Sequence, residues 1–222
     1  FNAEQYVIGY EVVPCRDTIQ KTSCLHCPTN CKTVPRKTVY LGEKNTLWMS
    51  QNNAASFTAL FSLPDADSWV EDLEISRSNP DVIYFSERNN RRGDGSIWKS
   101  EDAGKTFQKL SSPQSSTGGM RRVKAICISD TDSKVIFQGL RTGNSQNKVF
   151  KSEDGGQNWT NLTTSKISGL NISDIIYQNG TEDGVYIACD GGQIFYRNKN
   201  MTDWELHGTG LSVSHFTRAL KP

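Results

Sequence analysis

The sequence lacks the features that would place it in several large classes of protein. No apolar run approaches the roughly 20 residues that a membrane-spanning helix needs, so we predict no direct membrane span in this chain. Basic and acidic residues nearly balance, at 25 against 24, and the formal net charge of +1 gives no global field for nucleic acid or an anionic membrane. Nucleotide loops and zinc-protease motifs are missing. Partners must therefore be argued from local features.

Histidine is scarce, with three residues, His26, His207 and His215, and none of them stands at a paired metal-ligand spacing. We therefore predict no metal site and no cofactor. Only His26 has thiol groups nearby, and it belongs to the cysteine cluster described next.

The six cysteines fall into one cluster and two isolated residues. The cluster consists of Cys15, Cys24, Cys27 and Cys31. It lacks a second well-spaced CxxC pair, so we predict two disulfides that staple an insertion at 14–35, with a zinc site as the alternative. Cys127 and Cys189 lie in alternating, strand-like stretches, where a free cysteine behaves as a small core residue. A disulfide between these two is the less favoured interpretation.

The chain repeats itself at the period of a propeller blade. Four similar segments place an aromatic residue at steps of 50, 52 and 45 residues, at Trp48, Trp98, Phe150 and Phe195. Short segments rich in β-branched and aromatic residues precede and follow each of them. Four short strands per unit, with turn residues between them and no helical period, predict four-stranded antiparallel blades. The predicted fold class is an all-β propeller.

The predicted blades account for most of the chain. They span 5–61 with the insertion at 14–35, then 70–110, 121–162 and 171–206, and 211–222 begins a further blade. Propellers have about four to eight blades, and the last blade must be complete to close a ring. Because the sequence stops within a blade, we expect it to be part of a longer polypeptide or complex. The alternative is that a strand near 6–13 closes a small ring.

Two turns between the third and fourth strands carry the pattern S-x-D-x-G-x-[TN]-[WF]. The second unit has Ser100, Asp102, Gly104, Thr106 and Phe107, and the third has Ser152, Asp154, Gly156, Asn158 and Trp159. We expect the carboxylate to accept hydrogen bonds from the turn, the glycine to take a positive φ and the aromatic ring to be buried between sheets. The degenerate turns at 50–57 and 197–204 should lack this full staple. A carboxylate repeated in successive blades cannot converge on one site, so the predicted role is structural.

These repeats resemble the Asp-box, or BNR-repeat, propellers, a group that contains sialidases, xyloglucanase-like glycosidases, sortilin-type receptors and bacterial surface proteins. Within this group, segments at 180–197, 201–204, 210–211 and 218–222 look like the final blades of large proteins exported by bacterial type IX secretion. The resemblance covers roughly 38–222 and implies a secreted protein, extracellular or at the cell surface. The insertion at 14–35 departs from the usual pattern.

Few residues match a glycosidase site. A resemblance to sialidases would require an arginine triad and a Tyr/Glu pair, and the opening Arg-Ile-Pro motif is absent. A xyloglucanase-like site needs two opposed carboxylates, for which Asp72, Asp174 and Asp190 lie nearest the inner strands. We therefore assign no catalytic residue.

One polar segment is a candidate binding loop, formed by Arg91, Arg92 and Asp94. The tripeptide Arg92-Gly93-Asp94 is an adhesion signal in some extracellular ligands, although a plain polar turn explains the same residues. We expect the arginine pairs at 91–92 and 121–122 to lie in solvated loops near blade edges.

The predicted function is a non-catalytic extracellular module that binds other surface proteins or glycans, in adhesion or in the assembly of a larger complex. A propeller suits this role because its strands fix a scaffold while its loops vary. One alternative is a glycoside hydrolase with part of its site in missing blades. The other is a sortilin-like peptide receptor, which the lack of a cysteine-rich tail disfavours.

Overall fold

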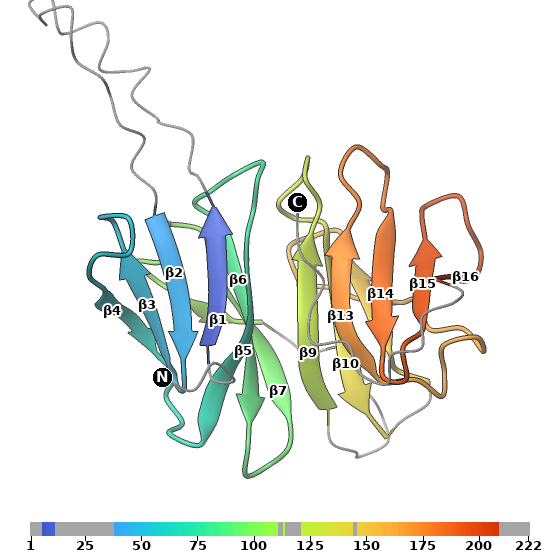
Figure 1. The fold of residues 1–222 in the computed structure, drawn as a ribbon, viewed down its shortest axis with the longest axis horizontal. Helices are drawn as coiled ribbons and strands as arrows, with labels where there is room; N and C mark the ends of the chain where they lie inside the picture. The colour runs from blue at the N-terminus through green and yellow to red at the C-terminus, as the bar shows by residue number, and fades with distance from the viewer. Residues whose placement is uncertain (1–5, 12–37, 111–112, 114–120, 144–145, 209–222) are drawn as a thin grey trace, which may run out of the picture.

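The computed structural model describes residues 6–11, 38–110, 113, 121–143 and 146–208. This part of the chain contains sixteen strands and no helix, and the strands form four antiparallel sheets of four strands each (Figure 1). The predicted all-β class and four-stranded units are therefore confirmed. The cysteine cluster with its insertion at 14–35 and the further blade at 211–222 lie outside the described residues.

Within each sheet, strands follow one another in chain order. The first sheet contains β1 (Tyr6–Glu11), β2 (Thr38–Glu43), β3 (Thr46–Ser50) and β4 (Thr58–Ser62). The second contains β5 (Ser68–Ile75), β6 (Ile83–Asn89), β7 (Gly95–Ser100) and β8 (Gln108–Lys109). The third contains β9 (Arg121–Ile128), β10 (Ile136–Thr142), β11 (Val149–Ser152) and β12 (Thr160–Asn161). The fourth contains β13 (Ile172–Tyr177), β14 (Val185–Cys189), β15 (Ile194–Arg197) and β16 (Glu205–His207).

Each pair of consecutive sheets shares one hydrophobic core. Tyr40 and Leu47 of the first sheet pack with Phe85 of the second, and two further clusters join the second sheet to the third and the third to the fourth. Cys127 and Cys189 are free and buried in the last of these cores, as expected. Figure 1 shows the sheets side by side in chain order, with β1, β5, β9 and β13 on the inside of the arc.

Neighbouring sheets approach closely where the second strand of one sheet carries a small residue. The register places Gly42, Ser86, Gly139 and Ala188 at equivalent positions. A Cβ added at Gly139 would lie 2.4 Å from Cγ2 of Ile172 in the next sheet, and one at Gly42 would lie 2.6 Å from Cγ1 of Val70. Small side chains at this position are thus needed for the sheets to stack.

Three inner strands carry a β-bulge at the same register position. The extra residue is Glu71 in β5, Lys124 in β9 and Ser173 in β13, as the shifts in strand pairing show. A bulge re-aims a side chain out of the regular alternation, and bulges are common beside functional sites.

Candidate binding site

The Asp-box turn of the second sheet is a closed set of local hydrogen bonds. Ser100 Oγ donates to Asp102 Oδ1 at 2.8 Å and accepts from the amide of Gly104 at 2.8 Å. The Asp102 carboxylate also accepts from the backbone amide of Thr106 at 2.9 Å and from its hydroxyl at 2.6 Å. Gly104 has a φ of +86°. The hydrogen bonds from Thr106 and Ser100 lower the pKa of Asp102 to about 2.

The third sheet repeats this arrangement. Asp154 accepts from the backbone and side-chain amides of Asn158 and from the Ser152 hydroxyl, and these bonds lower its pKa to about 2. Gly155 and Gly156 both have positive φ, at +76° and +92°. Every partner of the carboxylate that these bonds involve belongs to its own turn, which is what a structural staple requires.

The expectation that both degenerate turns lack the staple is wrong for the first sheet. Asn52 Oδ1 accepts from the Ser50 hydroxyl at 2.8 Å and from the amide of Ser56 at 3.0 Å, as the aspartates do. Its Nδ2 donates to the Ser56 hydroxyl at 2.7 Å. A neutral amide oxygen therefore replaces the carboxylate. In the fourth sheet the turn differs, because Asn198 Oδ1 accepts from the amide of Asn200.

The Asp-box aromatics pack between sheets, but burial is less complete than expected. Phe107 and Trp159 are only partly buried, whereas Trp204 is fully buried. The Phe107 ring lies 4.9 Å from that of Phe61 in the first sheet. Trp204 Nε1 donates to the carbonyl of Leu162 in the third sheet at 2.8 Å. These rings thus join consecutive sheets.

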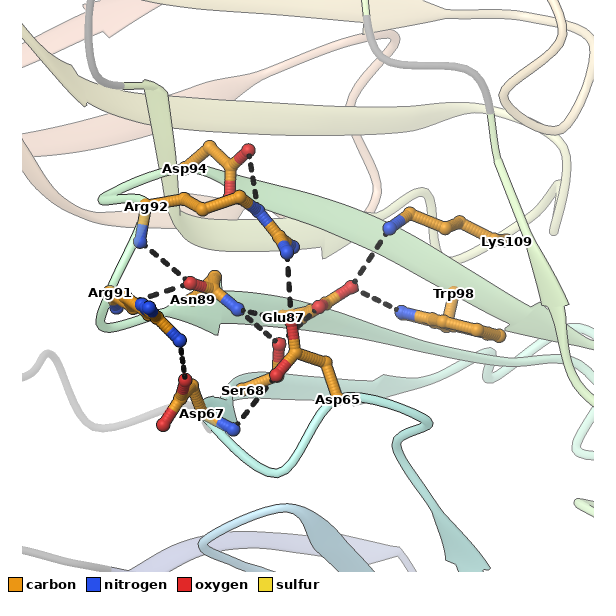
Figure 2. Close-up of polar contacts among 10 residues, drawn as sticks. All are labelled: Asp65, Asp67, Ser68, Glu87, Asn89, Arg91, Arg92, Asp94, Trp98 and Lys109. Atoms are coloured by element: carbon orange, nitrogen blue, oxygen red, sulfur yellow. Dashed lines mark hydrogen bonds and ion pairs between the residues drawn. The ribbon is translucent and has the colours of Figure 1, made fainter.

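The predicted binding loop is a tightly hydrogen-bonded turn after β6 (Figure 2). Asn89 Oδ1 accepts from the amides of Arg91 and Arg92 at 3.1 and 2.7 Å. Its Nδ2 donates to Asp65 at 2.9 Å and to the Ser68 hydroxyl at 3.1 Å. This one side chain fixes the turn to the segment that leads into β5.

The Arg92-Gly93-Asp94 tripeptide does not present its two charges separately. The Arg92 guanidinium folds back onto Asp94 at 3.3 Å and onto Asp65 at 2.8 Å (Figure 2). The side chain of Arg91 is 85% exposed, and its ion pair with Asp67 is long, at 3.9 Å. Arg91 is therefore the available charge of the turn.

The buried carboxylate of Glu87 stabilises the turn indirectly, through Ser68. Glu87 accepts from the Ser68 hydroxyl at 2.5 Å and from Trp98 Nε1 at 2.8 Å, and Lys109 lies 3.3 Å away (Figure 2). Burial alone would raise the pKa of Glu87, but these hydrogen bonds and the Lys109 charge outweigh it and lower the pKa. The carboxylate therefore stays ionised and holds Ser68, which in turn holds Asn89.

A cleft with a volume of about 430 Å³ opens beside this turn. It lies where the ends of three sheets meet, and the described residues that line it are Arg88, Asn89, Asn90, Gly93, Arg122, Arg141, Thr142, Gly143 and Asn171. None of these side chains is aromatic or aliphatic. Ser100 and Ser152, the first residues of the two Asp-boxes, pair with the starts of β6 and β10. The cleft lies at the other ends of these two strands, so the Asp-boxes lie away from it.

The bulge residue Glu71 organises the cations of the cleft. Arg122 donates to both Glu71 oxygens at 2.8 and 2.9 Å, Lys124 reaches Oε1 at 2.5 Å, and Arg88 lies 3.4 Å from Oε2. Burial of Glu71 alone would raise its pKa, but Lys124 and Arg122 outweigh burial and hold the pKa below its ordinary value. Three cations share one carboxylate, which leaves excess positive charge.

Arg122 corrects the expectation that the second arginine pair occupies a loop. Arg121 and Arg122 lie in β9, and the Arg122 side chain is only 26% exposed because it contacts Glu71 from the neighbouring sheet. Glu71, Lys124 and Arg88 were not among the residues predicted from the sequence to form a site. For Glu71 and Lys124 the available signal was a charged residue inside an otherwise apolar inner strand, and the bulges explain their positions.

Two other arginines complete the cleft wall. Arg88 stacks over the Trp69 ring, with its guanidinium carbon 5.0 Å from the ring centroid, and its Nε is buried without a hydrogen-bond partner. Burial lowers the pKa of Arg88 despite the nearby Glu71 charge. Arg141 lies 3.3 Å from Asp190, which accepts a hydrogen bond from the bulge residue Ser173.

The three aspartates considered as catalytic candidates serve other contacts. Asp72 is 2% exposed. Its carboxylate accepts one hydrogen bond from the backbone amide of Leu73 at 2.9 Å and one from the backbone amide of Ile126 in the next sheet at 2.8 Å. Asp174 is 3% exposed and accepts from the amide of Ile175. Asp190 pairs with Arg141. Asp72 thus ties two inner strands together.

Among the described residues, no three His, Cys, Asp or Glu side chains gather in a way that could hold a metal ion. The same part of the chain has no helix long and apolar enough to cross a membrane.

A protein-family model described as sortilin, neurotensin receptor 3 (Sortilin-Vps10) matches residues 45–174. Among curated proteins, a xyloglucanase from Hypocrea jecorina is 25% identical over 158 residues, covering 71% of this chain and 17% of that protein. A xyloglucanase from a Paenibacillus species is 24% identical over 131 residues, covering 52% of this chain and 12% of that protein. The chain thus spans less than a fifth of these relatives.

Solved propellers have the same fold. An ancestral GH74 enzyme superposes with a TM-score of 0.60 at 14% identity, over 84% of this chain and 25% of that one. The GH74 xyloglucanase from Xanthomonas campestris gives a TM-score of 0.59 at 17% identity, over 76% of this chain and 28% of that one. The predicted resemblance to Asp-box propellers with xyloglucanase and sortilin relatives is confirmed, and the chain is a propeller related to glycoside hydrolases.

Proposed function

We propose that this chain, which belongs to the Sortilin-Vps10 family of Asp-box propellers, is a non-catalytic binding module, extracellular or at a cell surface, that holds a glycan in its arginine-lined cleft. It acts as part of a longer polypeptide in adhesion or in assembly of a surface complex, and type IX secretion is the proposed export route. The observation that carries this proposal is the position of the cleft. It combines side chains from three sheets at the end opposite to the structural turns.

The electrostatics of the cleft favour binding over hydrolysis. Glycoside hydrolysis requires a carboxylic acid with a raised pKa to protonate the leaving oxygen. The pKa of Glu71 is instead lowered by its cations, so this carboxylate stays ionised and cannot act as that acid near neutral pH. Its geometry suits a different task, which is to orient Arg88 and Arg122 toward a ligand.

Burial along the repeat supports a longer ring. Tyr84 and Phe137 occupy equivalent positions on the faces toward the next sheet, and each is 1% exposed. The fourth sheet has Tyr186 at this position, only partly buried, and its ring contacts Tyr196 at 4.7 Å and His207 at 5.8 Å. A further blade would cover these rings. We expect Tyr186→Ala to destabilise a longer form of the protein more than the 222-residue chain, whereas Phe137→Ala should destabilise both alike.

Two glycine substitutions test the cleft directly. Gly143 lines the cleft and Gly169 does not, and a Cβ on either glycine would meet no atom within 4 Å. We expect Gly143→Trp to abolish retention of the chain on immobilised glycans, and Gly169→Trp to leave it unchanged. Equal retention of both variants would contradict the proposal.

The relatives favour one second candidate, a glycoside hydrolase, because curated xyloglucanases match the chain. Mass analysis of the same glycans after incubation distinguishes the two functions. The binding proposal predicts intact glycan. Shorter products that disappear with Gly143→Trp would instead support hydrolysis at the cleft.

A further inference from the structure

We propose that the cleft is specific for acidic saccharides, with a hexuronate carboxylate held by Arg122 and Arg88. This inference deepens the proposed glycan-binding function and rests on it. The proposed ligand carries a negative charge. It therefore differs from xyloglucan, the polysaccharide after which the matching xyloglucanases are named.

Positive charge faces the cleft. Arg88, Arg122 and Arg141 all line it, and the carboxylates that contact them are Glu71 and Asp190. Glu71 is shared by three cations, so its single negative charge does not neutralise the group. A guanidinium presents a planar set of donors that matches a carboxylate. An anionic group is therefore the natural complement.

Part of these guanidinium groups is available to a ligand. Arg122 binds Glu71 through Nε and Nη2, which leaves Nη1 outside this pair. Arg88 is fixed by stacking on Trp69 and contacts Glu71 through Nη1, and although its Nε is buried, 22% of the side chain is exposed. Because Glu71 and Trp69 fix their orientation in advance, these donors lose little freedom when a ligand binds.

The residue types that line the cleft favour one class of ligand. Aromatic rings offer a flat apolar surface on which a neutral sugar ring can stack. The described lining of the cleft contains none, and it provides side-chain amides from the exposed Asn90 and the half-buried Asn171. Such groups exchange hydrogen bonds with sugar hydroxyls. The described lining residues also include no aliphatic or aromatic residue that would hold the apolar side chains of a peptide, so a saccharide is favoured over an acidic peptide.

Calorimetric titration of the full chain with oligogalacturonate tests this inference. The fully methyl-esterified oligomer is the matched ligand, because it keeps the hydroxyls and loses the charge. We expect binding of the acid, at least tenfold weaker binding of the ester, and weakening of the acid complex by added salt. Arg122→Gln and Arg88→Gln should each weaken binding roughly tenfold to a hundredfold. Arg77→Gln, an exposed arginine beyond the opposite end of β5, is the control and should have no effect.

Equal affinity for acid and ester, or binding of a neutral xyloglucan oligosaccharide in place of the acid, would overturn the charge assignment and leave the glycan-binding function standing. Binding of poly-glutamate as tightly as oligogalacturonate would overturn the saccharide assignment. Binding of none of these ligands would overturn both this inference and the proposed function. Retained affinity in both arginine variants would overturn their assignment as ligand-binding residues.

Discussion

The stacking of neighbouring sheets can be tested at Gly139. Its backbone is an ordinary strand, with no positive φ, so only the available space decides whether a side chain fits. A Cβ there would lie 2.4 Å from Cγ2 and 3.1 Å from Cβ of Ile172, which is fully buried in the neighbouring inner strand. Overpacking of this kind costs about 1–3 kcal/mol. A gain of about 0.4–1 kcal/mol from the stiffer unfolded chain offsets part of it, so Gly139→Ala should destabilise by about 1–2 kcal/mol.

Urea unfolding followed by tryptophan fluorescence measures this effect. Gly169→Ala is the control, because its Cβ would meet open space, and we expect it to be neutral or slightly stabilising. Ile172→Ala alone should cost about 2–5 kcal/mol, but it removes the clashing methyl group. Gly139→Ala should then cost less in that background, with a coupling on the order of 1 kcal/mol. Equal stability of Gly139→Ala and Gly169→Ala, or strict additivity with Ile172→Ala, would refute the proposed contact between sheets.

Three further predictions follow from the ionisable and buried groups. Asp102 and Asp154 have pKa values of about 2 against an ordinary 3.8, so their contribution to stability is complete above pH 3.8 and is lost as the pH falls toward 2. The stability of the wild type relative to an Asp102→Asn/Asp154→Asn variant should decrease across that range in acid unfolding experiments, and a constant difference would contradict the staple. Cys127 and Cys189 should resist iodoacetamide in the folded protein and react in urea, because burial raises the thiol pKa of both, to about 12 at Cys189. Peptide mapping of the labelled sites checks this, and rapid labelling of either thiol without urea would contradict it. Glu71→Gln should lower the free energy of unfolding by about 1–3 kcal/mol, because Arg122 and two other cations lose their shared carboxylate. An unchanged urea midpoint would show that this cluster does not stabilise the fold.

The repeat and the sheets could be predicted because their determinants are local. Turn residues, β-branched strands and the Ser100-to-Phe107 pattern each act within a few residues of the chain. However, the Asp-box pattern requires an aspartate at a position where another hydrogen-bond acceptor can also serve. Asn52 was expected to break the staple, yet an amide oxygen accepts the same hydrogen bonds as a carboxylate when its donors are Ser50 and Ser56.

The cleft could not be predicted because its contacts are non-local. The sequence predicts Arg122 in a solvated loop near a blade edge, because a pair of charged residues is usually solvated. Its partner Glu71 is 51 residues away in sequence and reaches it only because a bulge re-aims the carboxylate. The turn at Arg91 and Arg92 was recognised, whereas the collapse of Arg92 onto Asp94 and Asp65 depends on a segment that precedes β5.

Hydrogen exchange of the full chain with and without oligogalacturonate tests the central claim most directly. If the cleft binds the ligand and the Asp-boxes are structural, added protection will be confined to the ends of β6 and β10 and the start of β9, around Asn89, Thr142 and Arg122. The turns that contain Asp102 and Asp154 will exchange at the same rate in both states. Protection at those turns, with none at the cleft, would contradict the account.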